Sequence, residues 1–134
     1  MISTELAAEL RDAGLVWNPV DGDQFRIAAP ELASDVFTVS TMTIEAHEFP
    51  TGTILGFNGT TEWALDSVAI EDALWLPRED QLRTLLRSSF RALRRADGVY
   101  EVDVELLGRP RVFAAPEPVD AYGRALLALI ELSR

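Results

Sequence analysis

Residues 100–106 alternate strictly between apolar and acidic side chains. Because successive side chains of a β-strand point to opposite faces, this pattern predicts a strand with one buried face and one wet face. Gly108 and Pro110 follow as turn residues and lead into a second β-prone run over residues 111–115. The two runs therefore predict a hairpin, which makes an antiparallel sheet part of the fold.

The region over residues 36–66 has the same β character. Its apolar positions change from one face to the other near residues 40–41, which predicts a bulge or a tight turn there. Residues 50–52 form a turn signal, and Asn58-Gly59 between two β-prone runs favours a two-residue hairpin turn. Together with a short strand over residues 24–28, this region predicts an antiparallel meander. Its expected register pairs Ile54 with Trp63 and Gly52 with Leu65.

Three helices complete the expected fold. Residues 3–13 carry an apolar stripe and end at Gly14, a common helix stop. Residues 78–95 form the clearest amphipathic pattern, which Pro77 opens and Asp97-Gly98 ends. A third helix follows Pro118 and runs to about residue 132. Its segment 125–130 is apolar on every side, so we expect it deep in the fold or at an interface between two copies.

These elements predict the α+β class, with a single domain over residues 1–134. The expected architecture is an antiparallel β-meander plus a hairpin in one sheet packed with three helices, in the order α-β-β-β-α-β-β-α. This order is similar to that of the acidic secretion-chaperone folds, which typically dimerise. A homodimer is therefore one expectation for this chain.

Several chemistries are excluded by missing side chains. All 12 basic residues are arginine, so the chain has no lysine for a Schiff base or for the phosphate loop of an ordinary nucleotide hydrolase. Without cysteine there is no disulfide, no thiolate metal site and no cysteine nucleophile. A single histidine excludes two-histidine zinc sites and HExxH proteases. We therefore expect no enzyme activity, no cofactor and no metal.

Charge and hydropathy limit the partners. A net charge of -10 repels nucleic acid phosphates, so we expect no DNA binding. The chain lacks an apolar run of 18 residues, and its first residues lack the basic region and apolar core of a secretion signal. We expect a cytoplasmic chain that does not insert into a membrane and that binds a protein partner.

His47 is the one candidate general base. It lies at two-residue spacing from Glu45 on the expected wet face, and a neighbouring carboxylate such as Glu48 could orient it. Glu45, His47 and Glu62 could also gather around a metal ion on neighbouring strands. An exposed strand histidine beside acidic neighbours explains the same pattern and is the interpretation we favour.

Two charged stripes form a candidate interaction surface. Within residues 78–95, six arginines against two acidic residues give a local charge of +4 in a chain of -10. On one helix the arginines would recur every four residues, where they repel one another unless they are solvated, paired with the chain's own carboxylates or bound to an acidic partner. The carboxylates of residues 101–105 form a solvated face or a docking surface for a basic partner. The candidate surface consists of Arg83, Arg87, Arg91, Arg94, Arg95, Glu101, Asp103 and Glu105.

Two segments resemble a known group of proteins. They read GFNGTTEWALDS at residues 56–67 and ALWLPREDQLR at residues 73–83. Both resemble segments of short actinobacterial proteins that carry the label of CpaE-type pilus assembly protein, and the similarity extends along most of the chain. The full proteins of that name are ParA-like ATPases with a lysine-bearing phosphate loop, which this sequence lacks. The resemblance therefore implies a small cytoplasmic protein linked to envelope or secretion machinery, without ATPase activity.

Three functional hypotheses follow from the sequence. The leading one is a non-enzymatic, acidic protein-interaction domain, an adaptor or chaperone linked to secretion or pilus machinery. The second is a small-ligand binder or hydrolase that uses His47 with nearby carboxylates. The third is an immunity-type inhibitor that masks a basic toxin.

Overall fold

The computed structural model describes residues 1–32, 34–40, 44–50, 52–57 and 67–133. The chain divides into two compact units. Unit 1 consists of residues 1–16 and 77–134, and unit 2 consists of residues 17–76. The expectation that the whole chain is one domain stays a prediction.

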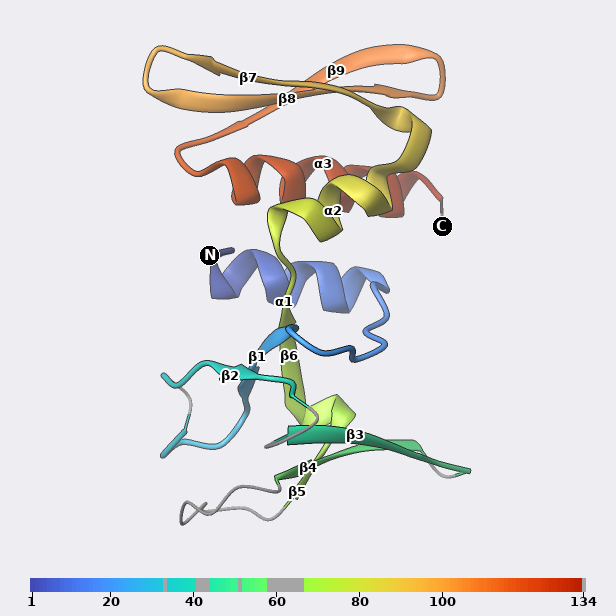
Figure 1. Ribbon diagram of the computed structural model, residues 1–134. Helices are drawn as coiled ribbons and strands as arrows, with labels where there is room; N and C mark the ends of the chain where they lie inside the picture. The colour runs from blue at the N-terminus through green and yellow to red at the C-terminus, as the bar shows by residue number, and fades with distance from the viewer. Residues whose placement is uncertain (33, 41–43, 51, 58–66, 134) are drawn as a thin grey trace. The chain divides into compact units, whose positions relative to one another are not determined.

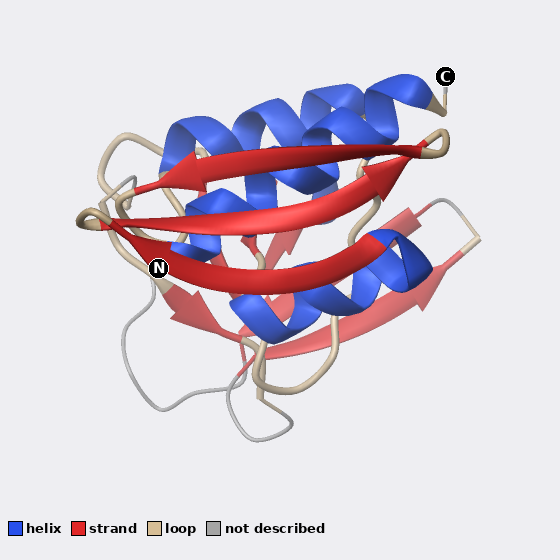
Figure 2. Ribbon diagram, turned by 90° about the horizontal axis from the view of Figure 1, so that it is seen from above, coloured by secondary structure: helices blue, strands red, loops and turns tan. Residues whose placement is uncertain are grey.

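Unit 1 holds three α-helices and one antiparallel sheet among its described residues (Figure 1). The sheet has the strand order β7-β8-β9, and its strands run side by side in Figure 2. Helix α3 contacts α1, α2, β8 and β9, so it is covered on more than one side, as its all-round apolar sequence predicts. The elements are α1 Thr4–Ala13, α2 Glu79–Leu86, a 3-10 turn Arg87–Ser89, β7 Phe90–Ala96, β8 Val99–Leu106, β9 Arg109–Ala115 and α3 Pro118–Leu132.

Strand β8 confirms the alternating pattern. Its apolar residues Val102, Val104 and Leu106 are buried, whereas Glu105 on the other face is exposed. β8 is the central strand of the sheet, paired with β7 on one edge and β9 on the other. The buried face packs on α3, whose Tyr122 lies in the core of unit 1.

The ends of α1 follow from local sequence. The Ser3 side chain accepts a hydrogen bond from the Leu6 amide, which satisfies one of the free N–H groups at the start of a helix. Gly14 ends the helix at φ 118°, a left-handed conformation that costs glycine little. The predicted helix and its stop are both confirmed.

The predicted helix over residues 78–95 is wrong in its second half. α2 ends at Leu86, Arg87 has φ 53°, and residues 90–96 form strand β7. Arginine, alanine and leucine favour a helix, but pairing with β8 outweighs that weak preference. The Asp97-Gly98 pair, which we interpreted as a helix stop, is the two-residue turn that joins β7 to β8. The predicted hairpin is therefore a three-stranded meander.

Unit 2 contains two further three-stranded antiparallel sheets among its described residues, with strand orders β2-β1-β6 and β3-β4-β5. The expectation of a single sheet is therefore wrong, because the described residues form one sheet in unit 1 and two in unit 2, whereas the α+β class and the three helices are confirmed. The elements are β1 Gln24–Ile27, β2 Phe37–Thr38, β3 Ile44–Phe49, β4 Gly52–Phe57, β5 Ser67–Ala69, a 3-10 turn Ile70–Asp72 and β6 Ala73–Leu76.

The turn near residues 50–52 is confirmed, since Phe49 pairs with Gly52 at the β3–β4 connection. The expected register after β4 is wrong, because Ile54 pairs with Ala69 and not with Trp63. The Asn58-Gly59 turn, Trp63 and Leu65 lie outside the described residues.

The core of unit 2 forms where β1, β2 and β6 meet. Phe25 is fully buried. The centroid of its ring lies 5.6 Å from that of Phe37 and 5.4 Å from that of Trp17. Trp75 stacks on Trp17 with ring centroids 6.4 Å apart. Asp23 is a charged residue that is buried in this unit. Its Oδ2 accepts a hydrogen bond from Trp17 Nε1 at 2.9 Å.

Candidate interaction site

The outer face of the β7–β9 sheet carries a network of ion pairs. Arg94 donates two hydrogen bonds of 2.8 Å to the carboxylate of Asp103, and its guanidinium lies 3.6 Å from Glu101. Arg91 donates to Glu105 at 2.8 Å. The register explains the contacts of Arg94, because this residue lies opposite Glu101, next to Asp103 on the same face of β8.

This network changes the titration of its members. The hydrogen bonds and charge of Arg94 hold the pKa of Asp103 below its ordinary value, despite a smaller opposing effect of desolvation. The hydrogen bond to Asp103 and its charge also raise the pKa of Arg94. The arginines therefore pair with the chain's own carboxylates, one of the alternatives that the sequence left open.

The structure does not bring the whole candidate surface together. Arg83 lies on α2, Arg87 caps the end of that helix, and the other three arginines lie on β7, so the predicted stripe along one helix face is wrong. Arg95 lies opposite Tyr100, with its guanidinium 5.8 Å from the ring centroid. A docking role for the eight residues stays a prediction, but their carboxylates are already largely compensated by Arg91 and Arg94.

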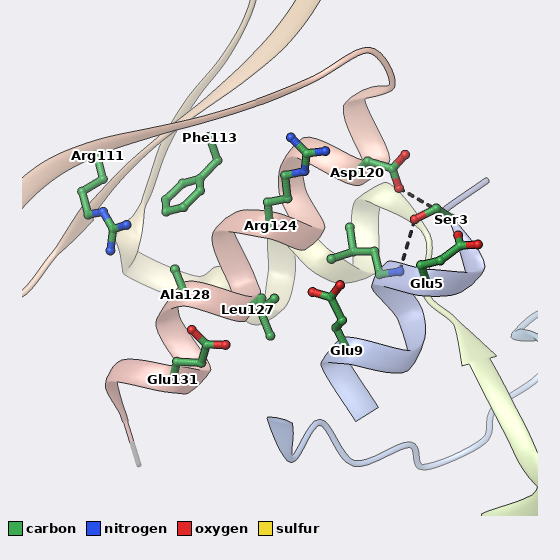
Figure 3. A pocket seen from close by; sticks show the side chains of 11 residues that line it. Ser3, Glu5, Glu9, Arg111, Phe113, Asp120, Arg124, Leu127, Ala128 and Glu131 are labelled. Atoms are coloured by element: carbon green, nitrogen blue, oxygen red, sulfur yellow. Dashed lines mark hydrogen bonds between the residues drawn. The ribbon is translucent and has the colours of Figure 1, made fainter. Parts of the chain in front are cut away.

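A second site is a groove of about 490 Å³ in unit 1 (Figure 3). Helix α3 runs along it, with β9 on one side and α1 on the other. We call it the α1–α3 groove. Its lining residues are Ser3, Glu5, Leu6 and Glu9 of α1 and its cap, Arg111 and Phe113 of β9, and Asp120, Arg124, Leu127, Ala128 and Glu131 of α3.

The groove has an apolar floor. Leu127 and Ala128 on α3 and Phe113 on β9 are half-buried, and Leu6 on α1 is buried. At one end the Ser3 amide donates to Asp120 Oδ1 at 2.9 Å, which ties the start of α1 to the first turn of α3. This hydrogen bond fixes α1 beside α3 at one end of the groove, so the packing of the two helices forms two of its walls.

Some charged side chains of the groove contact other groups of the chain, and others do not. Arg124 donates to the carbonyl of Ala114 at 2.6 Å, and the Arg111 guanidinium lies 4.9 Å from the centroid of the Phe113 ring. The exposed carboxylates of Glu5, Glu9 and Glu131, in contrast, form no hydrogen bond or ion pair within the described part of the chain. The lining holds four acidic residues against two arginines, so the groove carries a net negative charge.

The histidine hypothesis gains no further support. Glu45, His47 and Glu48 lie on β3, where His47 pairs with Ile54 of β4, and Glu62 lies outside the described residues. Within the described ranges, no group of three or more His, Asp or Glu side chains is arranged to hold a metal ion. No helix in these ranges is long and apolar enough to cross a membrane.

Sequence reasoning missed the α1–α3 groove. The apolar stripe of residues 3–13 places Glu5 and Glu9 on the exposed face of α1, but it does not show that this face borders a groove. The spacing of residues 120, 124, 127, 128 and 131 places them on one face of a helix, and this was the available signal. The other two walls come from distant parts of the chain, so the sequence pattern alone could not bring them together.

Comparison with known proteins identifies no relative: no family model, no curated protein and no solved structure matches the chain.

Proposed function

We propose that this chain is a non-enzymatic protein-interaction domain that holds a cationic, amphipathic segment of another polypeptide in the α1–α3 groove. The observation that carries the proposal is the pairing state of the groove. Its two arginines are engaged, whereas Glu5, Glu9 and Glu131 are exposed and have no partner among the described residues.

The chemistry of the occupant follows from the lining. Leu127, Ala128 and Phe113 offer an apolar floor, which favours burial of aliphatic side chains. The free carboxylates favour lysine or arginine at the edges of the same segment and raise its rate of association. An acidic adaptor or chaperone that receives basic segments fits this site, and secretion or pilus machinery is the setting that we propose for it.

A fluorescent peptide tests the proposal. The probe is a synthetic helical peptide with leucine on one face and lysine on the other, and its binding is followed by fluorescence anisotropy. Glu5→Gln, Glu9→Gln and Glu131→Gln combined should weaken binding by roughly tenfold, since an exposed ion pair contributes about 0.2–1 kcal/mol. Binding should also weaken as salt screens the charges.

The matched control removes the same charge elsewhere. Glu71→Gln, Glu79→Gln and Asp97→Asn combined neutralise three exposed carboxylates outside the groove. This variant should bind the peptide nearly as well as the native chain. Equal losses in both triple variants would show that only net charge matters, and the groove would then not be the site.

A further inference from the structure

The β8–β9 turn carries a leucine where the backbone disfavours one. Leu106 pairs with Arg109, so Leu107 and Gly108 form a two-residue connection, with φ values of 52° and 75°. Positive φ at both central residues strongly favours asparagine, aspartate or glycine, because other side chains clash with the backbone. Leucine at this position is therefore strained.

The same sheet contains its own comparison. The β7–β8 turn has the same length, and its Asp97 and Gly98 have φ values of 50° and 81°. Asp-Gly is a common sequence for this geometry, whereas Leu-Gly is not. Leu107 is also 81% exposed, so burial within the chain does not offset the strain. A contact made outside the chain would account for it.

The surroundings of Leu107 define a cationic, apolar patch. A hollow of about 600 Å³, which we call the turn patch, is lined by Leu106, Leu107, Arg109, Pro110, Arg111 and Leu132. Leu132 is 44% exposed. Arg109 is exposed and forms no hydrogen bond or ion pair within the described residues. The turn patch therefore presents leucine side chains beside a free positive charge.

We propose that the segment held in the α1–α3 groove is the turn patch of a second copy of this chain. Leu107 enters the apolar floor near Leu127, and Arg109 meets the free carboxylates of Glu9 and Glu131. This inference rests on the proposed function, because it names the partner of that same groove. It brings the carboxylates of one surface to the arginine of the other, and Glu9, Glu131 and Arg109 form no hydrogen bond or ion pair among the described residues.

The placement of the two surfaces favours a reciprocal dimer. Arg111 lines both hollows, and Glu131 and Leu132 are neighbours on α3, so the turn patch and the groove adjoin in unit 1. With a two-fold axis between the two copies, the turn patch of each copy occupies the α1–α3 groove of the other. Such isologous contact is the commonest form of association between identical chains.

Sedimentation velocity of the full chain tests the dimer. The native protein should sediment as a dimer, and Leu107→Asn should raise its dissociation constant by at least roughly a hundredfold, since two buried leucines are lost per dimer. At concentrations where both proteins are monomeric, Leu107→Asn should also unfold at a higher temperature, because asparagine suits the turn. A native chain that stays monomeric, or a Leu107→Asn variant that dimerises as well as the native chain, would overturn the inference.

A mixing experiment identifies the surfaces. Glu9→Arg with Glu131→Arg reverses the charge of the groove but keeps the turn, whereas Leu107→Asn keeps the groove. Neither variant should dimerise alone, and a mixture should form heterodimers through the one intact contact. A mixture without heterodimers, under conditions where the native chain dimerises, would contradict the assignment of these surfaces.

The peptide assay separates this inference from the proposed function. Leu107→Asn should bind the cationic peptide at least as tightly as the native chain, because no second copy competes for its groove. If the native chain is monomeric but binds the peptide, the dimer inference is contradicted and the proposed function of the groove still stands. If the native chain is monomeric and does not bind the peptide, both the dimer inference and the proposed function are contradicted.

Discussion

Gly123 of α3 faces Leu6 of α1 so closely that a Cβ atom at position 123 would lie 2.7 Å from Leu6 Cδ2 and 3.3 Å from its Cγ. Leu6 is only 7% exposed, so its side chain has little room to move away. Glycine inside a helix costs about 1 kcal/mol relative to alanine, and here the close approach of the two helices explains it.

We expect Gly123→Ala to lower the free energy of unfolding by about 1 kcal/mol, because overpacking by 1–3 kcal/mol exceeds the gain in helix propensity. Urea unfolding followed by circular dichroism measures the change. In a Leu6→Ala background the clash is absent, so the same substitution should stabilise by about 1 kcal/mol. Equal effects of Gly123→Ala in both backgrounds would show that Leu6 is not the obstacle.

Arg87, where α2 ends, gives a second prediction. Its φ of 53° and ψ of -134° suit glycine and strain any other residue. Arg87→Gly should therefore raise the free energy of unfolding by about 1 kcal/mol. Thermal unfolding measures the gain as a shift of several degrees.

Arg83 is the matched control, since it is also an exposed arginine but lies within α2. Arg83→Gly should lower stability by about 1 kcal/mol, the ordinary cost of glycine in a helix. If both substitutions destabilise the protein, α2 continues through residue 87 in solution and the backbone of Arg87 is helical.

The segment 87–95 shows why part of the fold could be predicted and part could not. Local signals gave α1 with its cap and stop, the alternating strand β8 and the long apolar helix α3. The arginine-rich segment has the residues of a helix, but its structure is decided by pairing with β8, which is a contact between two segments. Asp97-Gly98 is also a typical hairpin-turn sequence, but we interpreted it only as the end of the helix.

The α1–α3 groove could not be predicted from the sequence for a related reason. The hydrogen bond from the Ser3 amide to Asp120 spans 117 positions of the sequence. A single sequence shows which face of each helix is apolar, but not which helix packs beside it. Glu5, Glu9 and Glu131 could therefore be identified as exposed, and only the structure shows that they surround one hollow.

The ion pair of Arg94 and Asp103 predicts a dependence of stability on pH. The pKa of Asp103 is lowered in the folded chain, so its contribution to stability is complete above the unfolded value of about 3.8 and is lost as the pH falls through the folded value. The difference in unfolding free energy between the native chain and Asp103→Asn should therefore shrink below about pH 4. Urea unfolding across this range measures it.

Asp97→Asn is the control for that series, since Asp97 lies in the turn beside the same strands and accepts no hydrogen bond within the described residues. It removes one carboxylate from the same sheet without breaking an ion pair, so the effect specific to the ion pair is the change seen only in the Asp103→Asn series. A native chain and an Asp103→Asn variant that lose stability in parallel below about pH 4 would contradict the assigned role of the ion pair.

Asp23 gives the last prediction, in unit 2. Its Oδ2 accepts hydrogen bonds from Trp17 Nε1 at 2.9 Å and from the Val20 amide at 3.1 Å, and the residue is 1% exposed. Asp23→Ala should cost about 2–3 kcal/mol, because it leaves two donors without an acceptor. Asp23→Asn keeps an oxygen in place and should cost less than half as much. Urea unfolding gives both values, and the indole N–H resonance of Trp17 should move in Asp23→Ala more than in Asp23→Asn. Equal costs for the two variants would show that the carboxylate charge, and not the hydrogen bonds, holds the loop.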